Sequence, residues 1–135
     1  MEQVRAALGP EIVADGKKKS IRLDYGMLEL NFYSNICESF SVQVHRVAAH
    51  PDVGTVGVLP AGRRADFSAV SLEDLRDALL RQCSLRLEEL KPQGGYRCYQ
   101  VVGRHVNIFA VSDEEFGLES LAVGDIWSIS VAGAG

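Results

Sequence analysis

The sequence predicts an α+β fold, in which an antiparallel sheet is built from two similar helix-plus-β-meander halves with the helices packed on one face. Helix-like heptads open the two halves, at Glu2–Leu8 and at Glu73–Leu79. Each heptad leads into runs of aromatic and β-branched residues that alternate with polar ones, as half-buried strands do. The 135 residues fit a single domain. We expect its halves at about residues 1–48 and 71–131, with residues 49–70 as the connector.

The first half begins with a short amphipathic helix. Val4 and Leu8 share one helical face, and Gly9-Pro10 is a strong helix-stop signal. The polar stretch 11–19 is expected to be a loop, with room for one short extended piece.

Three strands are expected to follow as an antiparallel meander. Apolar and polar residues alternate over residues 21–25, 28–32 and 40–45. In the second of these strands, Leu30 should face the core and Glu29 should face outward.

The second half begins with a capped helix. Ser71 can cap its N-terminus, and Asp74 stands three residues later, close to a capping box. The apolar stripe of this helix comprises Leu72, Leu75, Leu79 and Leu80.

Strands are expected in the rest of the second half. Residues 92–95 are expected to form a loop, residues 96–102 and 105–111 predict a hairpin, and residues 126–131 predict a last strand. In that last strand, Trp127 is expected to pack inside and Ile126 to face outward.

Composition argues against nucleic-acid and membrane partners. The net charge is −4, and the only basic runs, Lys17–Lys19 and Arg63-Arg64, fall in turn-like stretches. No run has the roughly 18 apolar residues that a membrane span needs, and the N-terminus lacks a signal-peptide pattern. We therefore expect a soluble cytoplasmic protein. Its acidity suits a basic protein partner, since complementary charge accelerates association.

The cysteines and histidines do not predict a reactive centre. Cys37, Cys83 and Cys98 are an odd number without CxxC spacing, which favours reduced, buried thiols. A nucleophilic pair of Cys37 with His45, or of Cys98 with His105, stays open as an alternative.

Sequence motifs for cofactors and metals are also missing. The chain contains no phosphate-binding loop, dinucleotide fingerprint, nucleophile elbow or calcium loop. His45, His50 and His105 do not have the spacing of a zinc-ligand set. The sequence thus predicts no cofactor and no metal, and a protein that is not an enzyme.

Acidic pairs supply the candidate contact residues. These pairs lie in turn-like contexts, so a solvated acidic loop without a binding role is the alternative interpretation. Acid–base catalysis is disfavoured, because it needs one desolvated carboxyl group and nothing in these stretches would desolvate one. The candidate partner-binding residues are Glu88, Glu89, Asp113, Glu114 and Glu115.

The opening third of the chain resembles a theme found in small bacterial immunity-type proteins. The resemblance rests on Leu8-Gly9-Pro10, on Arg22–Phe32 with its Tyr-Gly-x-Leu-Glu-Leu segment, and on Ile36–Val42. Leu72–Leu80, Val106–Phe109 and Ser128–Ser130 are similar to the second half of those proteins. The tandem helix-plus-sheet plan is also similar to the β-lactamase inhibitor protein fold. The chain lacks the paired cysteines of secreted inhibitors, and the resemblance assigns a role to no individual residue.

The resemblance implies a protein that neutralises a toxin. The leading hypothesis is accordingly a non-enzymatic cytoplasmic protein-binding domain of immunity or inhibitor type. It would contact its partner through the open face of the sheet or through the acidic loops. The alternative is a small-molecule-binding dimeric module with a pocket between helix and sheet, and an unmarked enzyme is a third hypothesis. The sequence leaves a homodimer open.

Overall fold

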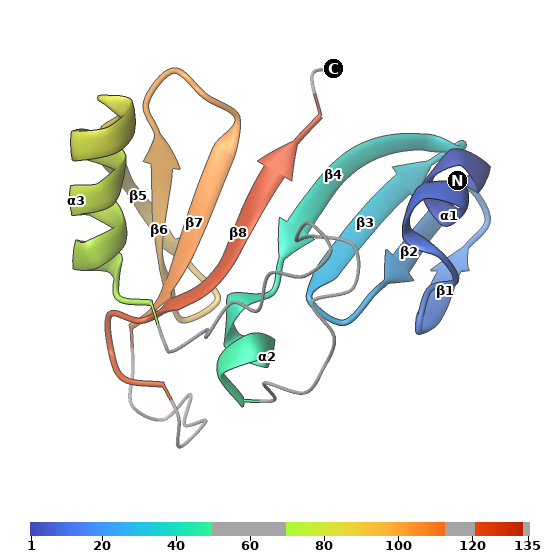
Figure 1. Cartoon of the computed structure of the whole chain (residues 1–135), viewed down its shortest axis with the longest axis horizontal. Helices are drawn as coiled ribbons and strands as arrows, with labels where there is room; N and C mark the ends of the chain where they lie inside the picture. Colours follow the sequence, from blue (N-terminus) through green and yellow to red (C-terminus); the bar gives the residue numbers. More distant parts are fainter. Residues whose placement is uncertain (50–69, 113–120, 134–135) are drawn as a thin grey trace.

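The computed structural model describes residues 1–49, 70–112 and 121–133, and in these ranges the chain forms an eight-stranded antiparallel sheet with a few short helices (Figure 1). The predicted α+β class is confirmed at this level. The elements in chain order are α1 (Glu2–Leu8), β1 (Val13–Lys17), β2 (Ser20–Asp24), β3 (Leu28–Tyr33), β4 (Ile36–Val42), α2 (Val44–Ala49), α3 (Leu72–Cys83), β5 (Leu87–Gln93), β6 (Tyr96–Val101), β7 (Val106–Val111) and β8 (Ile126–Ala132).

The strand order across the sheet is β1-β2-β3-β4-β8-β7-β6-β5. Strands β1 to β4 are therefore consecutive neighbours, and so are β5 to β8. The two runs meet where β4 pairs antiparallel with β8, at Phe40 opposite Val131 and Val42 opposite Ile129. The central pair of strands thus comes from distant parts of the chain.

One apolar cluster lies between α1 and strands β2 and β3. Leu23 is fully buried, and Phe32 is 3% exposed. Val4 and Leu8 of α1 pack against this cluster. Helix α1 ends as predicted, because Gly9 adopts a φ of +82° that a side chain would strain. The remaining members of the cluster are Met1, Ile21, Tyr25, Leu28 and Leu30.

A second apolar cluster lies between α3 and strands β6, β7 and β8. The Ser71 hydroxyl accepts a hydrogen bond from the Asp74 amide at 3.1 Å, which confirms the predicted N-cap. Leu72 and Leu79 belong to this cluster, but Leu80 is 50% exposed. Including Leu80 in the buried stripe was wrong, because it is rotated by roughly 100° from Leu79 around the helix.

The two edge strands extend beyond what the sequence predicted. Strand β1 lies in the polar stretch expected to be mainly a loop, and all of its residues are exposed. Strand β5 continues through Pro92 to Gln93, where a loop was expected. Both strands have only one neighbour, so they need neither a buried alternating pattern nor every amide hydrogen bond.

Two predictions about strand ends are wrong. Strand β4 stops at Val42, and His45 belongs to helix α2 and not to the strand. In β8, Ile126 is fully buried, whereas it was expected to face outward. A register shift in the pairing with β7, between Phe109 and Ala110, breaks the simple alternation, so that Ile126 and Ile129 both belong to the second cluster.

Candidate functional site

One face of the sheet carries polar side chains across almost its whole width. The register pairs one residue from each strand between β2 and β5 into a continuous row, which we call the polar row. In spatial order, its members are Asp24, Glu29, Ser41, Ser130, Asn107, Gln100 and Glu88. Since side chains alternate along a strand, the apolar neighbours of these residues point to the opposite face, where both clusters lie. We call the face with the polar row the polar face.

The middle of the polar row consists of small hydroxyl and amide groups. The hydroxyls of Ser41 and Ser130 lie 3.3 Å apart and form a hydrogen bond across the junction of β4 and β8. On the next row, the Asn31 amide donates to the Ser39 hydroxyl at 3.3 Å. These groups can both donate and accept hydrogen bonds, and they carry no charge.

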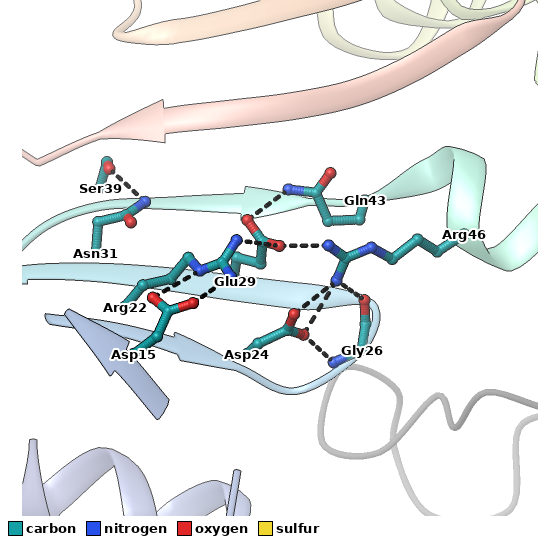
Figure 2. A network of polar contacts seen from close by, with 9 residues as sticks. All are labelled: Asp15, Arg22, Asp24, Gly26, Glu29, Asn31, Ser39, Gln43 and Arg46. Atoms are coloured by element: carbon teal, nitrogen blue, oxygen red, sulfur yellow. Dashed lines mark hydrogen bonds and ion pairs between the residues drawn. The ribbon is translucent and has the colours of Figure 1, made fainter. Parts of the chain in front are cut away.

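At the β2–β3 end of the row, Glu29 is 9% exposed and is surrounded by donors (Figure 2). Arg46 Nη2 lies 2.6 Å from its Oε1, and Arg22 Nη1 lies 3.4 Å from the same oxygen. The Gln43 amide donates to its other oxygen at 3.1 Å. Glu29 does lie on the outward face, as predicted, but it is not solvated. Its charge is tolerated there because three side chains donate to it.

Arg46 links helix α2 to the sheet. Its Nη1 donates to both carboxylate oxygens of Asp24, at 3.0 and 3.1 Å, and to the Gly26 carbonyl at 3.0 Å. The side chains of Arg46, Asp24 and Glu29 are 31%, 13% and 11% exposed. The guanidinium is thus held in a partly buried, multiply bonded geometry, unlike an ordinary surface ion pair.

Arg22 extends the network to the edge strand. Its Nε and Nη2 contact the two carboxylate oxygens of Asp15 at 3.2 and 2.5 Å, while Nη1 faces Glu29. Arg22 and Asp15 lie opposite each other on neighbouring strands, where opposite charges stabilise the pairing. The network therefore contains two guanidiniums, of Arg22 and Arg46, and three carboxylates, of Asp15, Asp24 and Glu29, so its net charge is negative.

Aromatic rings lie beside the first turn of α2, next to Arg46 in the sequence. The His45 and Trp127 rings stack with centroids 3.8 Å apart and an interplanar angle of 7°, and Tyr96 lies 5.3 Å from Trp127. His45 Nδ1 is 3.1 Å from the Trp127 carbonyl oxygen, so the proton of the neutral imidazole lies on Nδ1 and is donated. Trp127 is half-buried and packs against these rings, so the predicted placement of its side chain with the core was not correct.

Burial lowers the pKa of His45 below its usual 6.5, and the nearby Arg46 acts in the same direction. The neutral imidazole is therefore favoured in the folded protein. Its contribution to stability should be complete above the unfolded value of 6.5 and decrease as the pH falls below it. We expect acidification from about pH 7.5 to about pH 5.5 to destabilise the wild type more than His45→Gln. Urea unfolding of both proteins at both pH values measures this, and equal losses would contradict it.

The sequence-predicted contact residues are distributed differently from what was expected. Glu88 and Glu89 lie in strand β5 and not in a turn, which corrects their assignment to an acidic loop. Strand alternation separates them. Glu88 joins the polar row, and Glu89 lies opposite Tyr99, within 3.3 Å of the Arg97 guanidinium. Asp113, Glu114 and Glu115 lie outside the described residues.

The cysteines are divided by burial. Cys98 is 1% exposed, as predicted, but Cys37 and Cys83 are exposed, so the expectation that all three are buried was wrong. Within the described ranges, no three His, Cys, Asp or Glu side chains are grouped as metal ligands.

Two features of the polar face were not singled out from the sequence. One is the charge network around Arg46, which depends on helix α2. This helix begins at Val44, inside the strand predicted over residues 40–45. The other is the pair Tyr33 and Ile36, which lie opposite each other beside the β3–β4 turn and are 51% and 70% exposed. The register of Tyr33 with Ser20 places both on the polar face, and the alternation of residues 28–32 could have indicated this.

Among residues 1–49, 70–112 and 121–133, no helix has the length and apolar character required to cross a membrane. Comparison of the chain with protein-family models, with curated proteins and with solved structures gives no significant match.

Proposed function

We propose that the domain consists of two similar halves, each a helix followed by a four-stranded meander. The order of elements supports this, because α1 precedes β1 to β4 and α3 precedes β5 to β8. The last strands of the two meanders, β4 and β8, are the ones that pair at the centre. Each helix packs on the apolar cluster of its own meander, which leaves the polar face opposite both helices.

We further propose that the chain is a non-enzymatic protein-binding domain of inhibitor or immunity type, and that its polar face is the contact surface. The polar row is the observation that carries this proposal. A row of side chains from Asp24 to Glu88 crosses the sheet on the face away from both clusters. The half-buried hydroxyl and amide side chains in the middle of the row and the exposed Glu88 at its end offer directional hydrogen bonds across several strands, which suits a protein partner better than a small ligand.

Two exposed apolar side chains give this surface anchors. Tyr33 and Ile36 lie at its rim, and an exposed tyrosine is among the residues that contribute most to protein interfaces. Hydrogen-bonding groups at Asn31 and Ser39 lie on the adjacent row. Apolar anchors beside polar groups are the usual composition of a non-obligate interface.

The charge distribution favours a basic partner. Asp15 at one edge of the face has a side chain that is 51% exposed, and Glu88 at the other edge is exposed as well. The chain carries a net charge of −4. Complementary charge would accelerate encounter with a basic protein and make the association rate fall with added salt. The resemblance to immunity-type proteins supports a toxin as that partner.

A substitution at the centre of the polar row tests the proposal. The immobilised protein is incubated with a lysate of cells that naturally produce it, and bound proteins are quantified for wild type, Ser130→Arg and Ser84→Arg. Arginine at Ser130 places a long charged side chain on the face and should reduce recovery of a basic partner about tenfold or more. Ser84→Arg adds the same group at the exposed end of α3 and should bind like wild type.

Affinity measurements with the purified partner then distinguish the polar face from strand β5 as the contact surface. Activity measurements on the partner distinguish inhibition from binding alone. Equal affinity for Ser130→Arg and wild type would rule out the polar face. Loss of binding in Glu88→Lys/Glu89→Lys alone would place the contact on the edge strand β5. For an inhibitor-type protein, an equimolar amount of wild type should abolish the partner's own activity. If the partner stays fully active in the complex, the inhibitory role is wrong although the binding role is kept.

A further inference from the structure

An apolar cavity lies on the opposite side of the sheet from the polar row. Its volume is about 210 Å³, and it is found where the central strands β4 and β8 meet helices α2 and α3. The residues that line it include Met27, Val42, Val44, Leu75, Ile126 and Ile129.

The lining determines what the cavity can hold. All described lining residues are aliphatic or methionine side chains, so a polar ligand would lose its hydrogen bonds to water without replacement. An apolar cavity of roughly 150 Å³ in another protein stays dry and binds benzene or xenon. The present cavity is larger than that, so it has room for a single aromatic ring or a compact branched aliphatic group.

We propose that this cavity is a binding site for a small, uncharged, apolar molecule of one ring or comparable size. The site is independent of the proposed protein-binding function, because it uses the face that the polar row does not use. A ligand here would contact Val44 of α2, Leu75 of α3 and Ile129 of β8 together. It would therefore hold both helices against the central strands, adding the dispersion contacts that an empty cavity lacks.

The position of the site explains why a ligand would affect more than the cavity itself. Val44 starts the helix whose next residues, His45 and Arg46, bind the Trp127 carbonyl and the Asp24 carboxylate. Occupation of the cavity should thus raise thermal stability, and the gain should grow with the logarithm of the ligand concentration above saturation, as for any ligand that binds only the folded state.

Benzene is the probe for the test, titrated into methyl-labelled full-length protein and followed by NMR. The proposal expects saturable shifts at the methyl groups of Val42, Leu75 and Ile129, together with a rise in Tm. Leu75→Phe should weaken binding about tenfold or more, because the larger ring occupies the space. Leu79→Phe is the matched control, since Leu79 lies on the same helix and in the same cluster but does not line the cavity.

The outcomes separate clearly. Absence of saturable shifts in wild type, or shifts spread over exposed side chains such as Ile12 and Ile36, would overturn the proposal. Equal benzene affinity in Leu75→Phe and Leu79→Phe would also overturn it. If Leu75→Phe does not fold, Val44→Phe fills the cavity from α2 and replaces it, with the same expected loss. None of these results depends on whether a protein partner binds the polar face.

Discussion

Replacing Arg46 by methionine is expected to lower the free energy of unfolding by about 3 kcal/mol, because it leaves two partly buried carboxylates without their main donor. Asp24 and Glu29 lose contacts of 3.0 and 2.6 Å, and their side chains are only 13% and 11% exposed. Methionine keeps most of the aliphatic volume, so the loss reports the charge and not a packing defect. Urea unfolding at neutral pH measures it.

Arg97 provides the matched control for this experiment. Its pair with Glu89 also joins arginine to glutamate, but the two side chains are 43% and 54% exposed. Arg97→Met should therefore cost less than about 1 kcal/mol, as exposed ion pairs usually do. Adding Glu29→Gln to Arg46→Met should recover part of the loss, since it removes one of the unpaired charges. Similar costs for the two arginine variants would show that the network around Glu29 is no stronger than a surface pair.

Leu72→Ala is expected to destabilise the protein by about 3 kcal/mol, in the range of buried leucine truncations. Leu72 is 5% exposed and belongs to the cluster between α3 and the sheet. Leu80→Ala, on the same helix, removes the same atoms from a side chain that is 50% exposed. It should change the free energy of unfolding by less than about 0.5 kcal/mol, because truncations at the surface leave no cavity.

The pair of leucine variants is compared by thermal and urea unfolding. A larger cost for Leu80→Ala than for Leu72→Ala would mean that α3 is rotated on the sheet relative to its described position. Leu79 and Leu75 would then also change environment, and the cavity assigned to the junction of α2, α3 and the central strands would have to be reconsidered.

Short-range patterns predicted much of the fold. The Gly9 helix stop, the Ser71 cap and the alternation of residues 21–25 and 28–32 are local signals, and the structure agrees with them. The hairpin of β6 and β7 was likewise predicted close to its bounds. These signals come from the backbone preferences and side-chain periods of neighbouring residues, which do not depend on distant parts of the chain.

The candidate site was predicted less well. Alternation indicated that the side chain of Glu29 would point to the opposite face of the sheet from that of Leu30. Nothing in the local sequence showed that other side chains would bury Glu29 there. Its burial depends on Arg46, and Arg46 approaches only because the chain leaves β4 after Val42 and begins α2. Glu88 and Glu89 look like one acidic patch in the sequence, whereas their consecutive places in strand β5 send them to opposite faces of the sheet.

The sequence by itself determined the fold class, the Gly9 stop of α1, the Ser71 cap that begins α3, and the alternation that separates an apolar from a polar face. Only the tertiary structure decided that β4 pairs with β8. That contact joins segments about 90 residues apart, and no local sequence pattern indicates which distant strand will be the partner. This pairing places Ser41 beside Ser130 and completes the polar row. It also places Val42 beside Ile129, and both residues line the apolar cavity on the other face.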